Sequence, residues 1–228
     1  GISSLEGLQF AINLEFAQLG ENFISDISPL ANLSKLEFLN LNNNQITDLT
    51  PLQNLTALTE LYICCDSNAY TDISPLANLT NLEQLDIGGH ELGDISILAE
   101  FDNLIRLWVW SNDLDDSDLA VLEGKDLLYL EVSGNNLNNI EFLSDFPNLE
   151  AIHIGYNPII DLSPLTARTQ LEDVDLRGLG LSDISFLTSF TALSYLDLGD
   201  NLITDITPLV NNTGLGNEDF VSLDENLL

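Results

Sequence analysis

One sequence template recurs down this chain, and that regularity constrains the fold more than any other feature. Each copy follows the pattern LxxLxLxxNxIxDIxPLxNL, in which x is any residue. A fixed period of roughly 20–50 residues predicts that every copy folds as one unit of a stacked array. Successive copies begin 22 to 24 residues apart, at Leu14, Leu36, Leu58, Leu82, Leu104, Leu127, Leu149, Leu171 and Leu193.

The leucines of each copy predict a short buried strand. In the second copy, Leu36, Leu39 and Leu41 point inward from an extended segment, and Ile46 joins the same core after a turn. One copy cannot bury this face alone. Stacked copies can pair their strands about 4.8 Å apart, which predicts a parallel sheet roughly 45 Å long.

Two polar signals follow each predicted strand. An asparagine stands where the chain leaves the strand, and its amide can bind turn backbone groups that would otherwise be buried unpaired. Ser or Thr then precedes Pro, which is a helix-start signature, but few residues remain before the next strand. The asparagines are Asn22, Asn44, Asn112, Asn135, Asn157 and Asn201, and the Ser/Thr–Pro pairs begin at Ser28, Thr50, Ser74, Ser163 and Thr207.

These patterns predict an α/β fold, a leucine-rich-repeat solenoid with a curved parallel β-sheet on its concave face and short 3₁₀ or α turns on its convex face. We expect residues 1–228 to form a single domain of about ten repeats. Residues 1–13 would form its N-terminal edge, and residues 211–228 a degenerate C-terminal capping repeat. The third repeat has two extra residues within 64–68 and the fifth has one within 115–118, so we expect both repeats to bulge. His90 and Leu179 replace the asparagine in their repeats.

The stretches ISDISPLANLSKLEFLNLNNNQITDLTPL and TDISPLANLTNLEQLDI resemble the 22-residue repeats of bacterial internalin-type surface proteins. The resemblance covers nearly the full chain. It implies a protein-binding recognition module located outside the cell or at the bacterial cell surface. The chain begins at Gly1 and contains no Met, so we expect a processed or excised fragment. The helical cap of internalins and a wall-sorting motif are not seen, and surface attachment therefore follows from the resemblance alone.

Charge narrows the class of partner. The formal net charge is −32, from 37 acidic residues against five basic ones, which makes binding to nucleic acid through its phosphates implausible. No apolar run approaches the roughly 18 residues of a membrane span, so we expect no membrane insertion. The charge favours a basic protein surface, with divalent cations as non-specific partners. The adjacent Cys64 and Cys65 are too few for a structural zinc site, and we expect no cofactor.

Side-chain alternation places template positions three, five and seven on the concave face. This face carries both tryptophans and several tyrosines, and Trp, Tyr and Arg supply most of the energy at protein interfaces. The alternative is that strand aromatics merely cover neighbouring backbone. Glycans would use the same rings. The predicted partner-binding residues are Tyr62, Arg106, Trp108, Trp110, Tyr129, Glu131, His153, Tyr156, Asp173, Asp175, Tyr195 and Asp197.

His153 is expected between Glu131 and Asp175 of the neighbouring strands, where two carboxylates would raise the pKa of its imidazole. The same three residues are too far apart for easy metal binding, because the outer strands are roughly 10 Å apart. A further acidic row precedes the convex turns, and Asp favours such positions because it accepts backbone N–H bonds. That row is Asp26, Asp48, Asp72, Asp94, Asp116, Asp161, Asp183 and Asp205.

Catalysis is not expected. Asp175 and Asp197 have the spacing of paired carboxylates on adjacent strands, but an open sheet lacks the cleft that separates their pKa values. The chain also has no GxSxG, HExxH or phosphate-loop motif. The leading hypothesis is a secreted or surface recognition module that binds a partner on the concave face. The alternatives are an intracellular scaffold resembling phosphatase regulators and a glycan-binding surface module.

Overall fold

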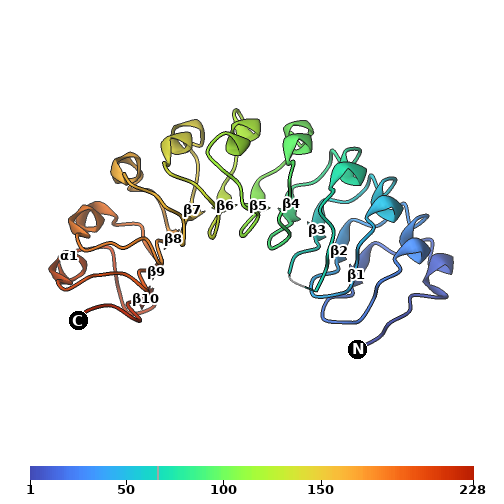
Figure 1. The fold of residues 1–228 in the computed structure, drawn as a ribbon, viewed down its shortest axis with the longest axis horizontal. Coiled ribbons are helices and arrows are strands. Elements are labelled where there is room, and N and C mark those ends of the chain that lie inside the picture. Colours follow the sequence, from blue (N-terminus) through green and yellow to red (C-terminus); the bar gives the residue numbers. More distant parts are fainter. Residues whose placement is uncertain (66) are drawn as a thin grey trace.

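The computed structural model describes residues 1–65 and 67–228 as an arc of stacked coils (Figure 1). Asp66, which belongs to the extra residues of the third repeat, lies outside the described residues. One parallel sheet of ten strands, in the order β1 to β10, lines the inside of the arc. The strands are β1 (Phe16–Gln18), β2 (Phe38–Asn40), β3 (Glu60–Tyr62), β4 (Gln84–Asp86), β5 (Arg106–Trp108), β6 (Tyr129–Glu131), β7 (Ala151–His153), β8 (Asp173–Asp175), β9 (Tyr195–Asp197) and β10 (Phe220–Ser222).

The strand register confirms the predicted repeat alignment. Each strand pairs with the equivalent three positions of the next copy, so Trp108 lies opposite Glu131, and His153 lies opposite Asp175. The longer third and fifth repeats do not disturb this pairing. Their extra residues come after β3 and β5, outside the paired strand positions, so the sheet stays continuous.

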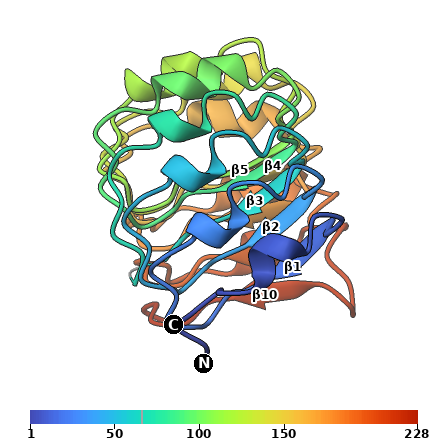
Figure 2. The ribbon, with the colours of Figure 1, turned by 90° about the vertical axis from the view of Figure 1, so that its right-hand side faces the viewer.

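Short helical turns cover the outside of the arc (Figures 1 and 2). Pro stands at the start of several of them, as the Ser/Thr–Pro signals predicted. The 3₁₀ turns are η1 (Leu8–Phe10), η2 (Ser28–Leu30), η3 (Thr50–Leu52), η4 (Ser74–Leu76), η5 (Ser96–Glu100), η6 (Asp118–Leu122), η7 (Glu141–Asp145), η8 (Ser163–Ala167) and η9 (Ser185–Ser189), and one α-helical turn is α1 (Thr207–Val210). In the described part of the chain, no helix is long and apolar enough to cross a membrane.

The core lies between the sheet and these turns. Its leucines and isoleucines stack in rows along the arc, and the middle residue of β2 to β9 is fully buried in each strand. Phe101, Phe146 and Phe190, each directly after a convex turn, are buried in the same core. Each fully buried side chain of this kind contributes roughly 1.5–3 kcal/mol through removal of apolar surface from water. The rows therefore hold the outward-facing strand positions in a fixed geometry.

Buried asparagines form the predicted ladder beside the sheet. Asn44 Oδ1 accepts the backbone N–H of Ile24 at 3.0 Å, while its Nδ2 donates to the carbonyls of Leu19 and Leu41. The equivalent amides repeat this pattern at Asn135, Asn157 and Asn201. Asn68 also belongs to the ladder, because the inserted residues shift the amide of the third repeat by two positions. In the fourth repeat, His90 stands at the asparagine position, and its Nε2 forms the corresponding hydrogen bond with the Ile63 carbonyl at 3.1 Å.

Candidate functional site

The predicted partner-binding residues gather on the concave face. Ten of the twelve lie on strands, and they come from β3, β5, β6, β7, β8 and β9. Trp110 and Tyr156 lie in the segments that follow β5 and β7. Both indoles are half-buried and lie outside the leucine core, while Arg106 is exposed. The alternation of strand side chains therefore places both indoles and Arg106 on the concave face, as the repeat predicts.

A continuous series of rings, here called the aromatic ladder, crosses the concave face from β1 to β10. Neighbouring ring centroids lie between 4.0 and 6.2 Å apart. Aromatic pairs at such separations contribute roughly 0.5–1.5 kcal/mol beyond the area that they bury. The ladder thus joins eight repeats into one surface. Its members are Phe16, Phe38, Tyr62, Trp108, Tyr129, His153, Tyr195 and Phe220.

Hydrogen bonds orient two tyrosines of the ladder, Tyr62 and Tyr129. The hydroxyl of Tyr62 lies 3.0 Å from Glu60 Oε2 and 2.9 Å from Gln84 Oε1. Burial and the nearby Glu60 carboxylate raise the pKa of the Tyr62 phenol well above its usual range. Burial and the charge of Glu131 do the same for the pKa of Tyr129. Both phenols therefore stay neutral at neutral pH, and their hydrogen bonds hold the two rings in place.

His153 is bound on both sides by carboxylates. Its Nδ1 lies 2.7 Å from Glu131 Oε2, and its Nε2 lies 2.8 Å from Asp173 Oδ1. His153 lies between Glu131 and Asp175 in register, as expected, but the second carboxylate that bonds its ring is Asp173, from the preceding outward position. Burial lowers the pKa of His153, but the hydrogen bonds and charges of Asp173 and Glu131 outweigh it and raise the pKa to about 10. The ring is thus an imidazolium at neutral pH.

The acidic C-terminal half of the face contains one basic group that the predicted set lacked. Arg177 Nε donates to the hydroxyl of Tyr156 at 2.8 Å, and its Nη1 lies 3.5 Å from Asp197 Oδ2. The signal in the sequence is its template position, which is seven in the eighth repeat and therefore outward-facing. Asp175 and Asp197 lie side by side, and each accepts a backbone N–H two residues further on. They organise turns at the strand ends.

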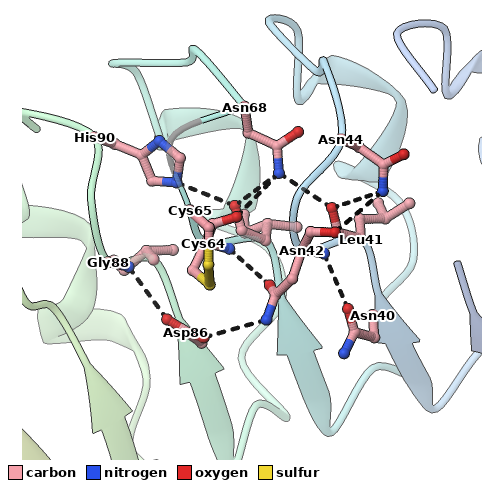
Figure 3. The surroundings of a disulfide bond; sticks show 12 residues. Asn40, Leu41, Asn42, Asn44, Cys64, Cys65, Asn68, Asp86, Gly88 and His90 are labelled. Carbon is pink, nitrogen blue, oxygen red and sulfur yellow. Dashed lines mark hydrogen bonds between the residues drawn. A yellow bond between two sulfur atoms is a disulfide. The ribbon is translucent and has the colours of Figure 1, made fainter. Parts of the chain in front are cut away.

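A second unpredicted group lies between Tyr62 and Trp108. Asp86 on β4 is only 8% exposed and accepts bonds from Gly88 N and, at 3.4 Å, from Asn42 Nδ2 (Figure 3). Burial raises the pKa of its carboxyl to about 6. The same Asn42 accepts the backbone N–H of Cys64, which forms a disulfide with Cys65 (Figure 3). The two adjacent cysteines of the chain are therefore joined to each other.

The acidic row precedes the convex turns, and its carboxylates accept backbone N–H groups two residues further on. Asp48 Oδ1, for example, accepts the backbone N–H of Thr50 at 2.8 Å, and hydrogen bonds from the side chain and the backbone of Thr50 lower the pKa of the carboxyl. In the fifth repeat Asp115 has this role, and the assignment of Asp116 is wrong. Asp116 instead accepts from Asn138 and Asn139 in the next repeat. Across residues 1–65 and 67–228, no group of three or more His, Cys, Asp or Glu side chains is arranged to hold a metal ion.

Comparison with known families agrees with the fold. The family described as Leucine Rich repeats (2 copies) matches residues 12–54, 34–78 and 169–211. No curated protein matches the chain at a significant level. Leucine-rich-repeat proteins are solenoids whose extended concave surfaces serve as protein-binding modules. The fold of this chain is that of such a module.

Solved structures give a closer relationship. The crystal structure of an internalin, InlF, from Listeria monocytogenes is 33% identical, with a TM-score of 0.74 over 99% of this chain and 71% of that one. Internalin C2 from the same organism is 27% identical, with a TM-score of 0.50 over 98% of this chain and 76% of that one. A leucine-rich-repeat protein of Leptospira interrogans shares the fold at 20% identity, with a TM-score of 0.73 over 96% and 57% of the two chains. The chain therefore belongs to the internalin-like leucine-rich-repeat proteins.

Proposed function

We propose that this protein is a recognition module, secreted or displayed at the bacterial surface, that binds a protein with a basic surface on its concave face. The observation that carries the proposal is the aromatic ladder with its flanking carboxylates. Fixed aromatic rings bind at low entropic cost, and they dominate the energetics of protein interfaces. The predicted partner-binding residues are contacts in this proposal, and none has a catalytic role.

The charge of the molecule supports a basic partner. Acidic groups outnumber basic ones by 32, and Asp173, Asp175 and Asp197 lie beside the ladder on β8 and β9. Complementary charge accelerates association and selects partners more than it adds affinity. A basic protein surface would therefore be drawn to this face, while the rings would hold it.

The disulfide and the family support an external location. Cys64 and Cys65 are bonded, and the described residues contain no free cysteine. Disulfides persist in oxidising environments and are rare in the cytosol. This favours the external module over the intracellular scaffold. Fractionation of the producing cells tests the location, and recovery of the protein only in the cytosol would contradict it.

The binding proposal is tested by affinity capture of soluble extracellular proteins with three versions of the chain. The concave variant carries Trp108→Ala and Tyr129→Ala, and the control carries Phe10→Ala, an exposed ring in η1 away from the sheet. We expect a basic protein whose affinity falls at least about tenfold in the concave variant, because loss of a central aromatic commonly costs about 2 kcal/mol. Equal capture by both variants, or capture of a glycan instead, would overturn the proposal.

A further inference from the structure

A cavity of about 350 Å³ opens on the concave face beside the aromatic ladder. Trp110 and Tyr156 form two of its walls, and Ser133 and Gly134 lie between them. The carboxylates of Glu131 and Asp175 also line it. Ligand cavities begin at roughly 300 Å³, so the space accommodates one long side chain of a partner.

Two glycines allow the aromatic walls to stand apart. A Cβ on Gly88 would lie 2.2 Å from Trp110 Nε1, so the indole rests directly on the backbone of the fourth repeat. A Cβ on Gly178 would lie 2.4 Å from Tyr156 Cδ1, so the phenol ring rests on the eighth repeat. The rings thus lean away from each other. The small residues of the sixth repeat leave the space between them open.

The two carboxylates differ in how their charge is balanced. Glu131 is paired with the His153 ring, and its Oε1 accepts the Ser133 N–H at 2.8 Å. Asp175 accepts the Arg177 N–H at 2.8 Å, but within the described residues no cationic group lies within 4.0 Å of it. The Arg177 guanidinium turns instead to Tyr156 and Asp197. Burial raises the pKa of Asp175 and outweighs the Arg177 N–H bond and the charge of the nearby His153 ring, which lower it.

We propose that this cavity is a subsite for one cationic side chain, lysine or arginine, of the protein partner. The inference rests on the proposed function and names the chemistry of one contact. The aliphatic stem lies between Trp110 and Tyr156, and the ammonium or guanidinium group pairs with Asp175. Aromatic faces attract cations, and arginine also stacks on them, so rings and carboxylate act together.

The test needs no partner. The chain has two tryptophans, so its ¹H–¹⁵N NMR spectrum contains two indole N–H signals, which Trp110→Phe assigns. N-acetyl-lysine methylamide and N-acetyl-arginine methylamide are the cationic probes, and N-acetyl-norleucine methylamide is the neutral one. We expect a saturable shift of the Trp110 signal with the cationic probes, while the Trp108 signal moves much less. Absence of a saturable shift, or an equal shift with the neutral probe, would overturn the subsite.

Two matched variants separate a local contact from the overall charge. Asp175→Asn and Asp48→Asn each remove one charge, and in each variant the amide oxygen can still accept its backbone bond. Asp48 lies at a convex turn, away from the cavity. We expect the Kd of the cationic probes to rise about fivefold in Asp175→Asn and to change by less than about twofold in Asp48→Asn. Equal effects of the two variants would overturn the proposal.

The two proposals fail in different ways. Loss of probe binding removes this subsite, but it leaves the Trp108→Ala, Tyr129→Ala capture experiment unaffected, because that variant keeps Trp110 and Tyr156. A partner that binds the Trp108→Ala, Tyr129→Ala variant as tightly as the wild-type protein would contradict the proposal that the concave face is the main interface. Probe binding at the cavity would still be measured in that case.

Discussion

His153 Nε2 lies 2.8 Å from Asp173 Oδ1, although the residue opposite His153 in strand register is Asp175. The imidazole therefore reaches diagonally across the sheet to the preceding outward row, while Glu131 binds its other nitrogen from the preceding strand. Diagonal neighbours in a sheet are within reach of long and aromatic side chains. The result is a charged cluster spanning three strands in the centre of the proposed interface.

The first prediction concerns the pH dependence of this cluster. The pKa of His153 is raised to about 10, so its contribution to stability is complete below the unfolded value of about 6.5 and is lost as the pH rises through about 10. We expect the free energy of unfolding to fall by roughly 1.5–3 kcal/mol between pH 7 and 10, a range typical of hydrogen bonds to charged groups. Urea unfolding at both pH values measures it.

His153→Gln is the control for this pH dependence. Tyr62 and Tyr129 stay protonated at pH 10 because burial raises the pKa of both phenols. Lys125 titrates in both proteins, so its effect cancels in the comparison. The free energy of unfolding of His153→Gln should therefore fall much less between pH 7 and 10 than that of the wild-type protein. An identical change in wild type and variant would show that other groups cause it.

The second prediction concerns the asparagine ladder. Asn135 Oδ1 accepts the N–H groups of Asn112 and Leu114, both at 3.0 Å, and its Nδ2 donates to two buried carbonyls. Asn135→Ala should lower the free energy of unfolding by at least about 3 kcal/mol, because each buried group left unpaired costs roughly 1–3 kcal/mol. Asn136→Ala removes a neighbouring exposed amide, whose one side-chain bond goes to the Asp113 carbonyl at 3.1 Å, and should cost no more than about 1 kcal/mol. Chemical denaturation of both variants compares them, and similar losses would refute the role of the ladder.

The repeat predicted most of the fold because one template position has one environment in every copy. Leu39 and Leu61 share a buried position, and Tyr62 and Trp108 share an outward one, so period and alternation were sufficient. Side-chain directions were not predictable in this way. His153 bonds Asp173 and not Asp175, its neighbour in register, and a linear pattern does not contain such a side-chain direction. The cavity walls likewise depend on rings resting on Gly88 and Gly178, residues that are distant in sequence from each other.

The third prediction concerns the disulfide. Cys64 and Cys65 are adjacent in sequence, so the bond closes a minimal loop. A disulfide stabilises chiefly by constraining the unfolded chain, and a loop of about 15 residues contributes roughly 3 kcal/mol, with smaller loops contributing less. We expect reduction to lower the free energy of unfolding by well under about 3 kcal/mol and to keep unfolding cooperative. Intact-mass measurement after alkylation should show no label without reductant and two labels after reduction.

The control for reduction is the Cys64→Ser, Cys65→Ser double variant, which lacks both sulfurs. Its unfolding should match that of the reduced wild type, and reductant should leave it unchanged. A labelled thiol in the unreduced protein would contradict the bond. Loss of cooperative unfolding in the variant would show that the disulfide stabilises the third repeat more than its loop length predicts.

The last prediction concerns ionic strength. A net charge of −32 produces self-repulsion in the compact chain, and salt screens repulsion between exposed charges because the Debye length falls from about 10 Å at 0.1 M to about 3 Å at 1 M. We expect NaCl to raise the melting temperature, with each 1 kcal/mol gained worth about 2–4 °C in a chain of this size. The stabilising His153 cluster is half-buried and is screened less than the exposed acids.

The variant Glu172→Gln tests this repulsion at one pair of acids. Glu172 and Glu150 are exposed on neighbouring repeats, and the Glu172 N–H donates to the Glu150 backbone carbonyl at 2.8 Å. The substitution removes one of these two like charges. That variant should melt higher than wild type at low salt, and the difference should shrink at 1 M NaCl. A melting temperature that falls or stays constant as NaCl is added would show that repulsion between the acids does not limit the stability of this solenoid.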